Sequence, residues 1–278
     1  MYEYVVTDVF TGTPLEGNPA AVVTDARGLP AGRMQRIARE FNLSETVFVL
    51  PAESGGDARV RIFTPSAELP FAGHPVLGAA FVLGEGSGAR EIALETGAGI
   101  VPLELVREDG RVVTGRMRQP VPTWETYEGA EELLAALGVE SSGLPVEVYC
   151  NGPRHVYVEL GSEHAVASLQ PDMGALARLP GLGVGCVAGA GRRWKSRNFV
   201  PAFGVPEDPA TGSAAGPLAV HLSRHGRIAF GQEIEIRQGA EIGRPSRLYA
   251  RATGEGDRID TVEVAGAAVI VARGQLDA

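Results

Sequence analysis

Cysteine is scarce in this chain of 278 residues. Only Cys150 and Cys186 occur, and they stand far apart without the spacing of metal ligands. We therefore expect neither a disulfide framework nor a zinc site, and a reducing cytoplasm fits this composition best.

Positive charge and long apolar runs are scarce as well. Lys and Arg number 25 against 34 Asp and Glu, which gives a formal net charge of -9. Such a chain repels phosphate backbones, so nucleic acid is not an expected partner. No stretch reaches 18 uninterrupted apolar residues, and residues 1–10 lack the basic and apolar regions of a signal peptide. Neither a membrane span nor a cleaved leader is expected.

The length favours two domains of about 100–200 residues each. The segment 118–129 contains two prolines and no clean period, which makes it the best candidate linker. Helices are predicted at 32–41, at about 75–83 where Pro75 suits a first helical position, and at 131–137. Strands are predicted at 46–50, 58–64, 99–106, 146–150, 155–160, 184–188, 195–200, 232–237, 247–253 and 259–273.

An internal repeat relates the two halves. The segment 70–83 aligns with 209–222 at an offset of 139 residues, with Pro70 on Pro209, Gly73 on Gly212 and Leu83 on Leu222. Each copy predicts a glycine turn that opens a helix of small residues, and chance alignment of Gly and Pro is the alternative. A helix that begins at a glycine turn presents backbone N–H groups and the positive end of its dipole. Two such turns favour a small carboxylate ligand, although each alone can be an ordinary helix cap.

Three polar residues border these turns or a junction between elements. Glu45 is expected where the helix 32–41 gives way to the strand 46–50, among apolar residues such as Phe48 and Phe71. Burial of that kind raises the pKa of a carboxyl group and lets it take and return a proton near neutrality. His74 could orient a substrate or relay a proton, and Asp208 could accept a hydrogen bond. The alternatives are a solvated or capping Glu45, a structural His74, and an Asp208 that only caps the turn before residue 211.

Other candidates favour structural interpretations. The basic segment 189–197 could attract an anion or form salt-bridged surface. The remaining histidines show no metal-like spacing and are expected to be structural; they are His155, His164, His221 and His225. No phosphate-loop or Rossmann spacing is present, so no nucleotide cofactor is expected.

Long blocks of the sequence resemble the phenazine-biosynthesis PhzF family over nearly the whole chain. They include GTPLEGNPAAVV, MQRIAREFNLSETVFVL, RIFTPSAELPFAGHPVLGAA, YCNGPRHVYVEL and AGAGRRWKSRNFVPAFGVPEDPATGSAAGPLAVHLSRHG. The resemblance implies an α/β (α+β) fold of the diaminopimelate-epimerase-like class, with two pseudo-symmetric domains that each curve a mostly antiparallel sheet around a central helix. It implies domains at 1–118 plus 262–278 and at 119–261, with the active site in the cleft between them.

The resemblance also implies the site and the reaction. The catalytic glutamate of the family falls on Glu45, its histidine on His74 and its aspartate on Asp208. Substrate-binding roles fall on Ser44, Gly73, Gly212 and Ser213. The implied reaction is the isomerisation of trans-2,3-dihydro-3-hydroxyanthranilate in phenazine biosynthesis, in which Glu45 carries a proton from C3 to C1 without metal, flavin or nicotinamide. Related epimerases carry a cysteine at each glycine turn, and this chain has none there, so epimerisation by two thiols is not expected.

Two other functions stay open at this point. The chain could act as an isomerase or epimerase on another small carboxylate, because a fold does not fix a substrate. It could also bind a carboxylate without catalysis. A cytoplasmic homodimer is expected from the resemblance.

Overall fold

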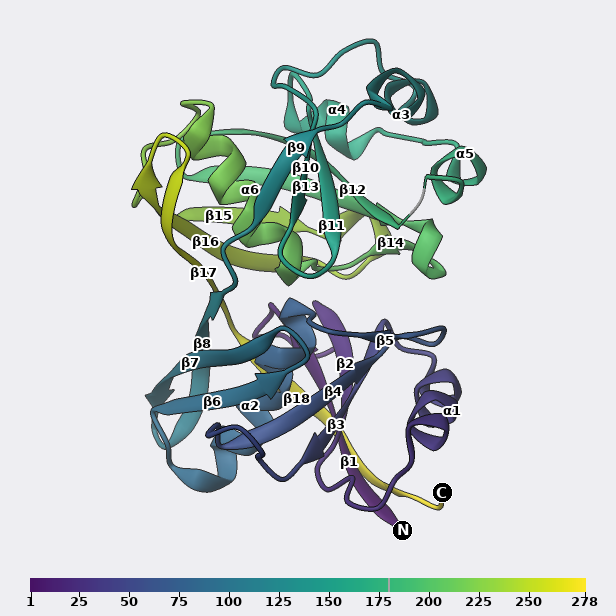
Figure 1. The fold of residues 1–278 in the computed structure, drawn as a ribbon, viewed down its shortest axis with the longest axis vertical. Coiled ribbons are helices and arrows are strands. Elements are labelled where there is room, and N and C mark those ends of the chain that lie inside the picture. Colours follow the sequence, from purple (N-terminus) through teal and green to yellow (C-terminus); the bar gives the residue numbers. More distant parts are fainter. Residues whose placement is uncertain (180) are drawn as a thin grey trace. The chain divides into compact units, whose positions relative to one another are not determined.

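Strands are the commonest regular elements of this chain, because β-branched and alternating segments recur along its length. The computed structural model describes residues 1–179 and 181–278. The chain divides into unit 1, made of Met1–Pro120 and Val264–Ala278, and unit 2, made of Val121–Glu263 (Figure 1). The family resemblance implies these divisions after residue 118 and before residue 262. No helix of the described residues is long and apolar enough to cross a membrane.

Unit 1 is a curved sheet with two helices. Its elements are β1 (Tyr2–Val9), β2 (Asn18–Val23), α1 (Ala31–Phe41), β3 (Glu45–Leu50), β4 (Ala58–Phe63), β5 (Glu68–Leu69), α2 (Gly73–Ser87), β6 (Glu91–Thr96), β7 (Gly99–Glu108), β8 (Arg111–Gln119) and β18 (Ala268–Leu276). Neighbouring strands run in the order β18-β1-β2-β3-β4-β6-β7-β8, with β5 also paired to β4. The pairs β2–β3 and β4–β6 are parallel, and the other pairs are antiparallel.

Unit 2 repeats this plan with additional helices. Its elements are β9 (Thr123–Thr126), α3 (Ala130–Leu137), β10 (Glu147–Cys150), β11 (Arg154–Glu159), α4 (Glu163–Ala167), α5 (Met173–Ala177), β12 (Leu182–Ala190), β13 (Arg193–Val200), η1 (Pro201–Phe203), β14 (Val205–Asp208), α6 (Gly212–Arg224), β15 (Ile234–Gln238), η2 (Ala240–Ile242) and β16 (Ser246–Glu255). The strand order is β9-β10-β11-β12-β13-β15-β16, with β14 paired to β13. Strand β17 (Arg258–Gly266) leads from unit 2 into unit 1.

The connectivity of the two units confirms the pseudo-symmetric fold class. In each unit two parallel pairs flank an antiparallel hairpin, which is β3–β4 in unit 1 and β12–β13 in unit 2. In each unit a short strand then pairs with the second strand of the hairpin and leads directly into a buried helix. These helices, α2 and α6, begin at Gly73 and Gly212, the two glycines that the repeat aligns.

Helix α2 is apolar on all its faces because it lies inside unit 1, in contact with β1, β2, β3, β6, β7, β8 and β18. Gly78 lets the helix approach β1 closely, since a side chain there would meet the Thr7 hydroxyl at 2.8 Å. Helix α1 instead buries one face, with Met34 and Ile37 packed beside Phe48 and Phe63.

Two local expectations are wrong, and a third holds only in part. Helix α2 begins at Gly73, so Pro75 is its third residue; a proline is tolerated there because the first turn needs no backbone donor. The segment 118–129 contains the boundary between the units, after Pro120, although β9 lies within it and pairs with β10. Phe48 does not surround Glu45: successive side chains of a strand alternate between its faces, and Phe48 packs with Met34 and Ile37 of α1.

Candidate active site

Glu45 and His74 meet inside unit 1. Glu45 is the first residue of β3, and β3 runs parallel to β2 with Glu45 opposite Ala20. His74 is the second residue of α2. Their side chains are 15% and 4% exposed, and His74 Nε2 lies 3.2 Å from Glu45 Oε2. The two residues that sequence analysis selected for proton transfer are therefore within reach of one another.

The His74 imidazole is neutral in the fold. Burial lowers its pKa to about 3, although a hydrogen bond with the Pro19 backbone acts in the opposite direction. Its Nδ1 lies 3.2 Å from Nδ2 of Asn18, the first residue of β2. The Pro19 backbone can only accept a hydrogen bond, because proline has no N–H, so the bond to Pro19 uses the single N–H of the neutral ring. Neutral His74 thus places no full positive charge beside the carboxylate.

Two other expected site residues adjoin this pair. Ser44 is half-buried and directly precedes β3. Gly73 is buried and opens α2, and the preceding Ala72 offers no side-chain cap to the helix N-terminus. The backbone N–H groups in the first turn of α2 are therefore not capped by the side chain at the N-cap position.

In unit 2, Asp208 belongs to a buried hydrogen-bond network. Asp208 ends β14, and its Oδ2 accepts a hydrogen bond of 2.6 Å from the Thr211 hydroxyl. Gln238 Nε2 donates to the Asp208 carbonyl at 2.7 Å and to Thr211 Oγ1 at 3.0 Å, while Gln238 Oε1 accepts from Asn198 at 3.0 Å. The turn contact that sequence analysis raised as the alternative role of Asp208 is thus present.

Ser213, the second residue of α6, corresponds to His74 in unit 1. Gly212 opens the helix and both residues are buried. The Ser213 hydroxyl lies 3.1 Å from Nε2 of His155 on β11. From the sequence alone His155 is expected to be structural, whereas the structure places it in contact with a candidate site residue.

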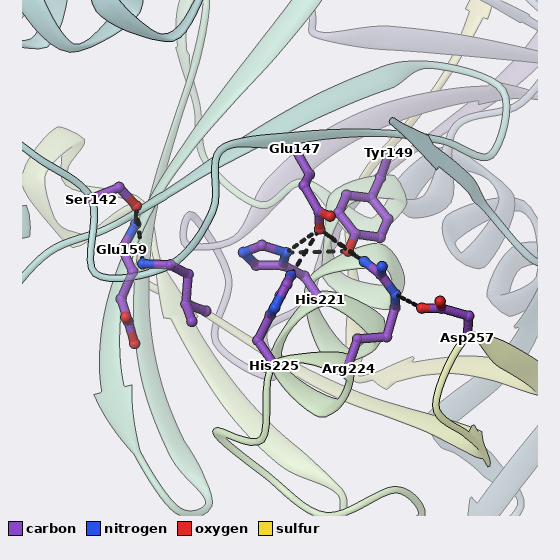
Figure 2. A network of polar contacts seen from close by, with 9 residues as sticks. Ser142, Glu147, Tyr149, Glu159, His221, Arg224, His225 and Asp257 are labelled. Carbon is purple, nitrogen blue, oxygen red and sulfur yellow. Dashed lines mark hydrogen bonds and ion pairs between the residues drawn. The ribbon is translucent and has the colours of Figure 1, made fainter. Parts of the chain in front are cut away.

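A second polar cluster lies at the other end of α6 (Figure 2). Glu147 Oε2 lies 3.3 Å from His221 Nδ1, 2.9 Å from His225 Nε2, 2.8 Å from Arg224 and 2.8 Å from the Tyr149 hydroxyl. The expectation that these histidines lack metal-like spacing is wrong, since His221 and His225 stand one helical turn apart and face one carboxylate within 4.8 Å.

The Glu147 carboxylate already has a cationic partner, however. Burial opposes its ionisation, but hydrogen bonds from His221, His225, Tyr149 and Arg224 together hold the pKa of Glu147 well below its usual range. A metal ion would compete with the Arg224 guanidinium for the same oxygen. We interpret the cluster as a network that ties β10 to the end of α6.

The basic segment 189–197 forms ion pairs, as its structural interpretation predicts. Lys195 contacts Glu241 at 2.5 Å and Arg197 contacts Glu207 at 2.8 Å. Arg197 also donates to the carbonyl of Leu169 at 2.8 Å, which fixes it within unit 2. These two cations are therefore occupied by partners within the same unit.

A family model described as phenazine biosynthesis-like protein matches residues 7–274 of the chain. The chain belongs to this PhzC-PhzF family. A family member from Pseudomonas aeruginosa, named trans-2,3-dihydro-3-hydroxyanthranilate isomerase, is 58% identical over 99% of both chains. A relative of the same name from Pseudomonas chlororaphis is 55% identical, again over 99% of both. The solved PhzF-family structure from Bacillus anthracis has a TM-score of 0.86 at 28% identity, covering 100% of this chain and 99% of its own.

Three neighbours of the site in this PhzF-family chain escaped sequence analysis, namely Asn18, His155 and Gln238. Asn18 lies 56 positions before His74, and His155 lies 58 positions before Ser213. The one available signal was the alternation of the strand predicted at 155–160, which puts His155 and Tyr157 on one face. Which helix that face meets depends on packing that no local pattern encodes.

Proposed function

We propose that this chain is a cofactor-independent isomerase that converts trans-2,3-dihydro-3-hydroxyanthranilate in phenazine biosynthesis. The family match and the relatives of that name, at 54–58% identity over 99% of each chain, support the substrate. The observation that carries the mechanism is the buried Glu45 carboxylate, 3.2 Å from the neutral imidazole of His74.

In the proposed reaction Glu45 takes the proton from C3 and returns one to C1. The double bonds shift between these carbons, so substrate and enol product have the same atoms, and the enol then becomes a ketone. One carboxyl group can serve both transfers because it cycles between its ionised and protonated forms. His74, whose Nε2 lies 3.2 Å from Glu45 Oε2, is assigned to orienting the substrate or relaying a proton beside this carboxylate. On the family resemblance we assign a catalytic role to Asp208 as well, and substrate contacts to Ser44, Gly73, Gly212 and Ser213.

The thiols of the chain do not suit the chemistry of a two-cysteine epimerase. Cys186 is buried in β12, and burial raises the pKa of its thiol to about 12. Cys150 ends β10. Neither lies at the start of α2 or α6, where the resemblance implies that opposed thiols would stand.

Turnover in deuterated buffer tests the proposal. The wild-type chain should consume trans-2,3-dihydro-3-hydroxyanthranilate and place deuterium on the ring, with Glu45→Gln as the inactive control. Absence of turnover at high enzyme concentration would exclude this substrate. The same assay on other small cyclic carboxylates would then distinguish a different isomerase from a protein that only binds.

We also propose that the chain is a cytoplasmic homodimer. The location rests on the scarcity of cysteine, and the assembly rests on the family resemblance. Light scattering coupled to size-exclusion chromatography should give twice the chain mass of 29.1 kDa. A single-chain mass at micromolar concentration would contradict the dimer.

A further inference from the structure

The first turn of α6 is held by side chains from the β10–β11 hairpin of unit 2. Asn151 Nδ2 donates to the Ser213 carbonyl at 3.0 Å, and the Tyr157 hydroxyl donates to the Ala214 carbonyl at 2.6 Å. The Ser213 carbonyl is open to Asn151 because its usual helical partner, four residues on, is Pro217, which has no N–H. The backbone that carries Ser213 is thus fixed from outside the helix.

His155 adds a contact to the Ser213 side chain itself. The imidazole is 3% exposed, and burial lowers its pKa to about 4, so it is neutral near pH 7 and carries one N–H. Its Nε2 lies 3.1 Å from Ser213 Oγ, while its Nδ1 has no hydrogen-bond partner among the described residues. Gly183 packs against Nδ1, and a side chain there would approach that nitrogen to 2.7 Å. His155 therefore uses only one of its nitrogens.

The position of the single ring proton follows from this environment. A buried N–H without an acceptor is rarer in native structures than an acceptor without a donor. The proton therefore belongs on Nε2, where it can be donated to Ser213 Oγ, and Nδ1 is the unpaired acceptor. Because Ser213 then accepts from His155, the hydroxyl proton of Ser213 must find another acceptor.

We propose that His155 is a positioning residue that turns the Ser213 hydroxyl so that its proton is offered to the carboxylate of the substrate. The inference rests on the proposed function and deepens it. Ser213 is buried at the start of α6, and His155 is the one hydrogen-bond partner of its hydroxyl that we find among the described residues. The helix N-terminus adds a partial positive charge at the same place, which suits an anion.

The direction of the His155–Ser213 hydrogen bond decides which ligand the site favours. With the proton on Nε2, Ser213 presents a donor, which stabilises a carboxylate. With the proton on Nδ1, Ser213 would donate to His155 and present only lone pairs, which repel a carboxylate. His155 thus acts on affinity for the anion through Ser213, without touching the proton that moves in the reaction.

A double-mutant cycle tests this role with 3-hydroxyanthranilate as the ligand, measured by titration calorimetry. Ser213→Ala and His155→Leu should each weaken binding about tenfold, the size expected for one hydrogen bond to a charged group. The double variant should be no more than about twofold weaker than either single variant, because both remove the same contact. His155→Gln retains an amide N–H and should restore most of the affinity. In turnover assays KM should rise while kcat stays within about twofold.

Several outcomes would overturn the inference. Additive effects of His155→Leu and Ser213→Ala would show that the two residues act separately, and an unchanged affinity of His155→Leu would show that His155 is not needed. A His155→Gln variant as weak as His155→Leu would indicate packing alone. Thermal unfolding checks that each variant folds, and His164→Leu, on an exposed histidine, is the matched control. Normal binding without wild-type turnover would overturn the proposed function alone; no wild-type binding would overturn both.

Discussion

The two central helices of this protein start alike and are surrounded differently. Helices α2 and α6 each begin at a glycine, after a short strand, in units of the same connectivity. The second residue is His74 in α2 and Ser213 in α6. His74 faces Asn18 and Glu45, whereas Ser213 faces His155.

The two units repeat one backbone arrangement, but the side chains at their helix starts differ and suit different chemical roles. Unit 1 places a carboxylate beside a neutral imidazole, which suits proton transfer. Unit 2 surrounds the helix start with amides and hydroxyls, together with the Asp208 carboxylate and the neutral imidazole of His155. The proposed function accordingly assigns proton transfer to Glu45 and contact with the substrate carboxylate to Ser213.

The largest expected effect is on the proton carrier of unit 1. Glu45→Gln keeps the size of the side chain but cannot take up a proton, so kcat should fall by about 10³–10⁴-fold. Calorimetry should show affinity for 3-hydroxyanthranilate within about threefold of wild type. Glu40→Gln, on an exposed position of α1, is the matched control for steady-state kinetics. Unchanged turnover of Glu45→Gln would remove Glu45 from the mechanism.

A smaller loss of turnover is expected when the partner of Glu45 is removed. His74→Phe keeps a buried ring but removes the polar imidazole nitrogen 3.2 Å from the Glu45 carboxylate, and kcat should fall about 100-fold. Ser213→Ala, at the matching position of unit 2, should change KM and leave kcat nearly unchanged. If both variants change only KM, the proposed roles of His74 in catalysis and Ser213 in binding are wrong.

The hydrogen-bond network of unit 2 should contribute mainly to stability. Gln238→Leu removes one buried hydrogen-bond partner from each of Thr211 and Asn198, so the free energy of unfolding should fall by about 2 kcal/mol. Urea denaturation measures this loss. Gln275→Leu, an exposed position on β18, should stay within about 0.5 kcal/mol of wild type. Equal effects of the two substitutions would contradict a supporting role for Gln238.

The smallest effect is a pH dependence that both units share. Burial lowers the pKa of His74 to about 3 and that of His155 to about 4, while unfolded histidine titrates near 6.5. Below about pH 6.5 the unfolded chain therefore binds more protons, and stability should fall as the pH falls toward 4. Between pH 7.5 and 5.5, His155→Gln should lose about 1 kcal/mol less than wild type in urea denaturation. An identical pH dependence would show that His155 is not buried in its neutral form.

Much of the fold was predictable because its signals are local. The helix at 32–41 and most strands follow from side-chain periodicity, and the aligned glycines located the starts of α2 and α6. The position of Glu45 at the end of a helix-to-strand connection was likewise predictable, and β3 begins at this residue. The surroundings of Glu45 were not, since strand alternation turns Phe48 toward α1 instead.

The sequence by itself determined the repeat, the two glycine helix starts and the residues that could carry chemistry. Only the tertiary structure decided which of these residues meet. Asn18 reaches His74, His155 reaches Ser213, and Gln238 reaches Asp208, across 56, 58 and 30 positions of chain. The physical reason is that such contacts are set by strand register and by how each helix packs on its sheet, and both depend on the whole unit rather than on neighbouring residues.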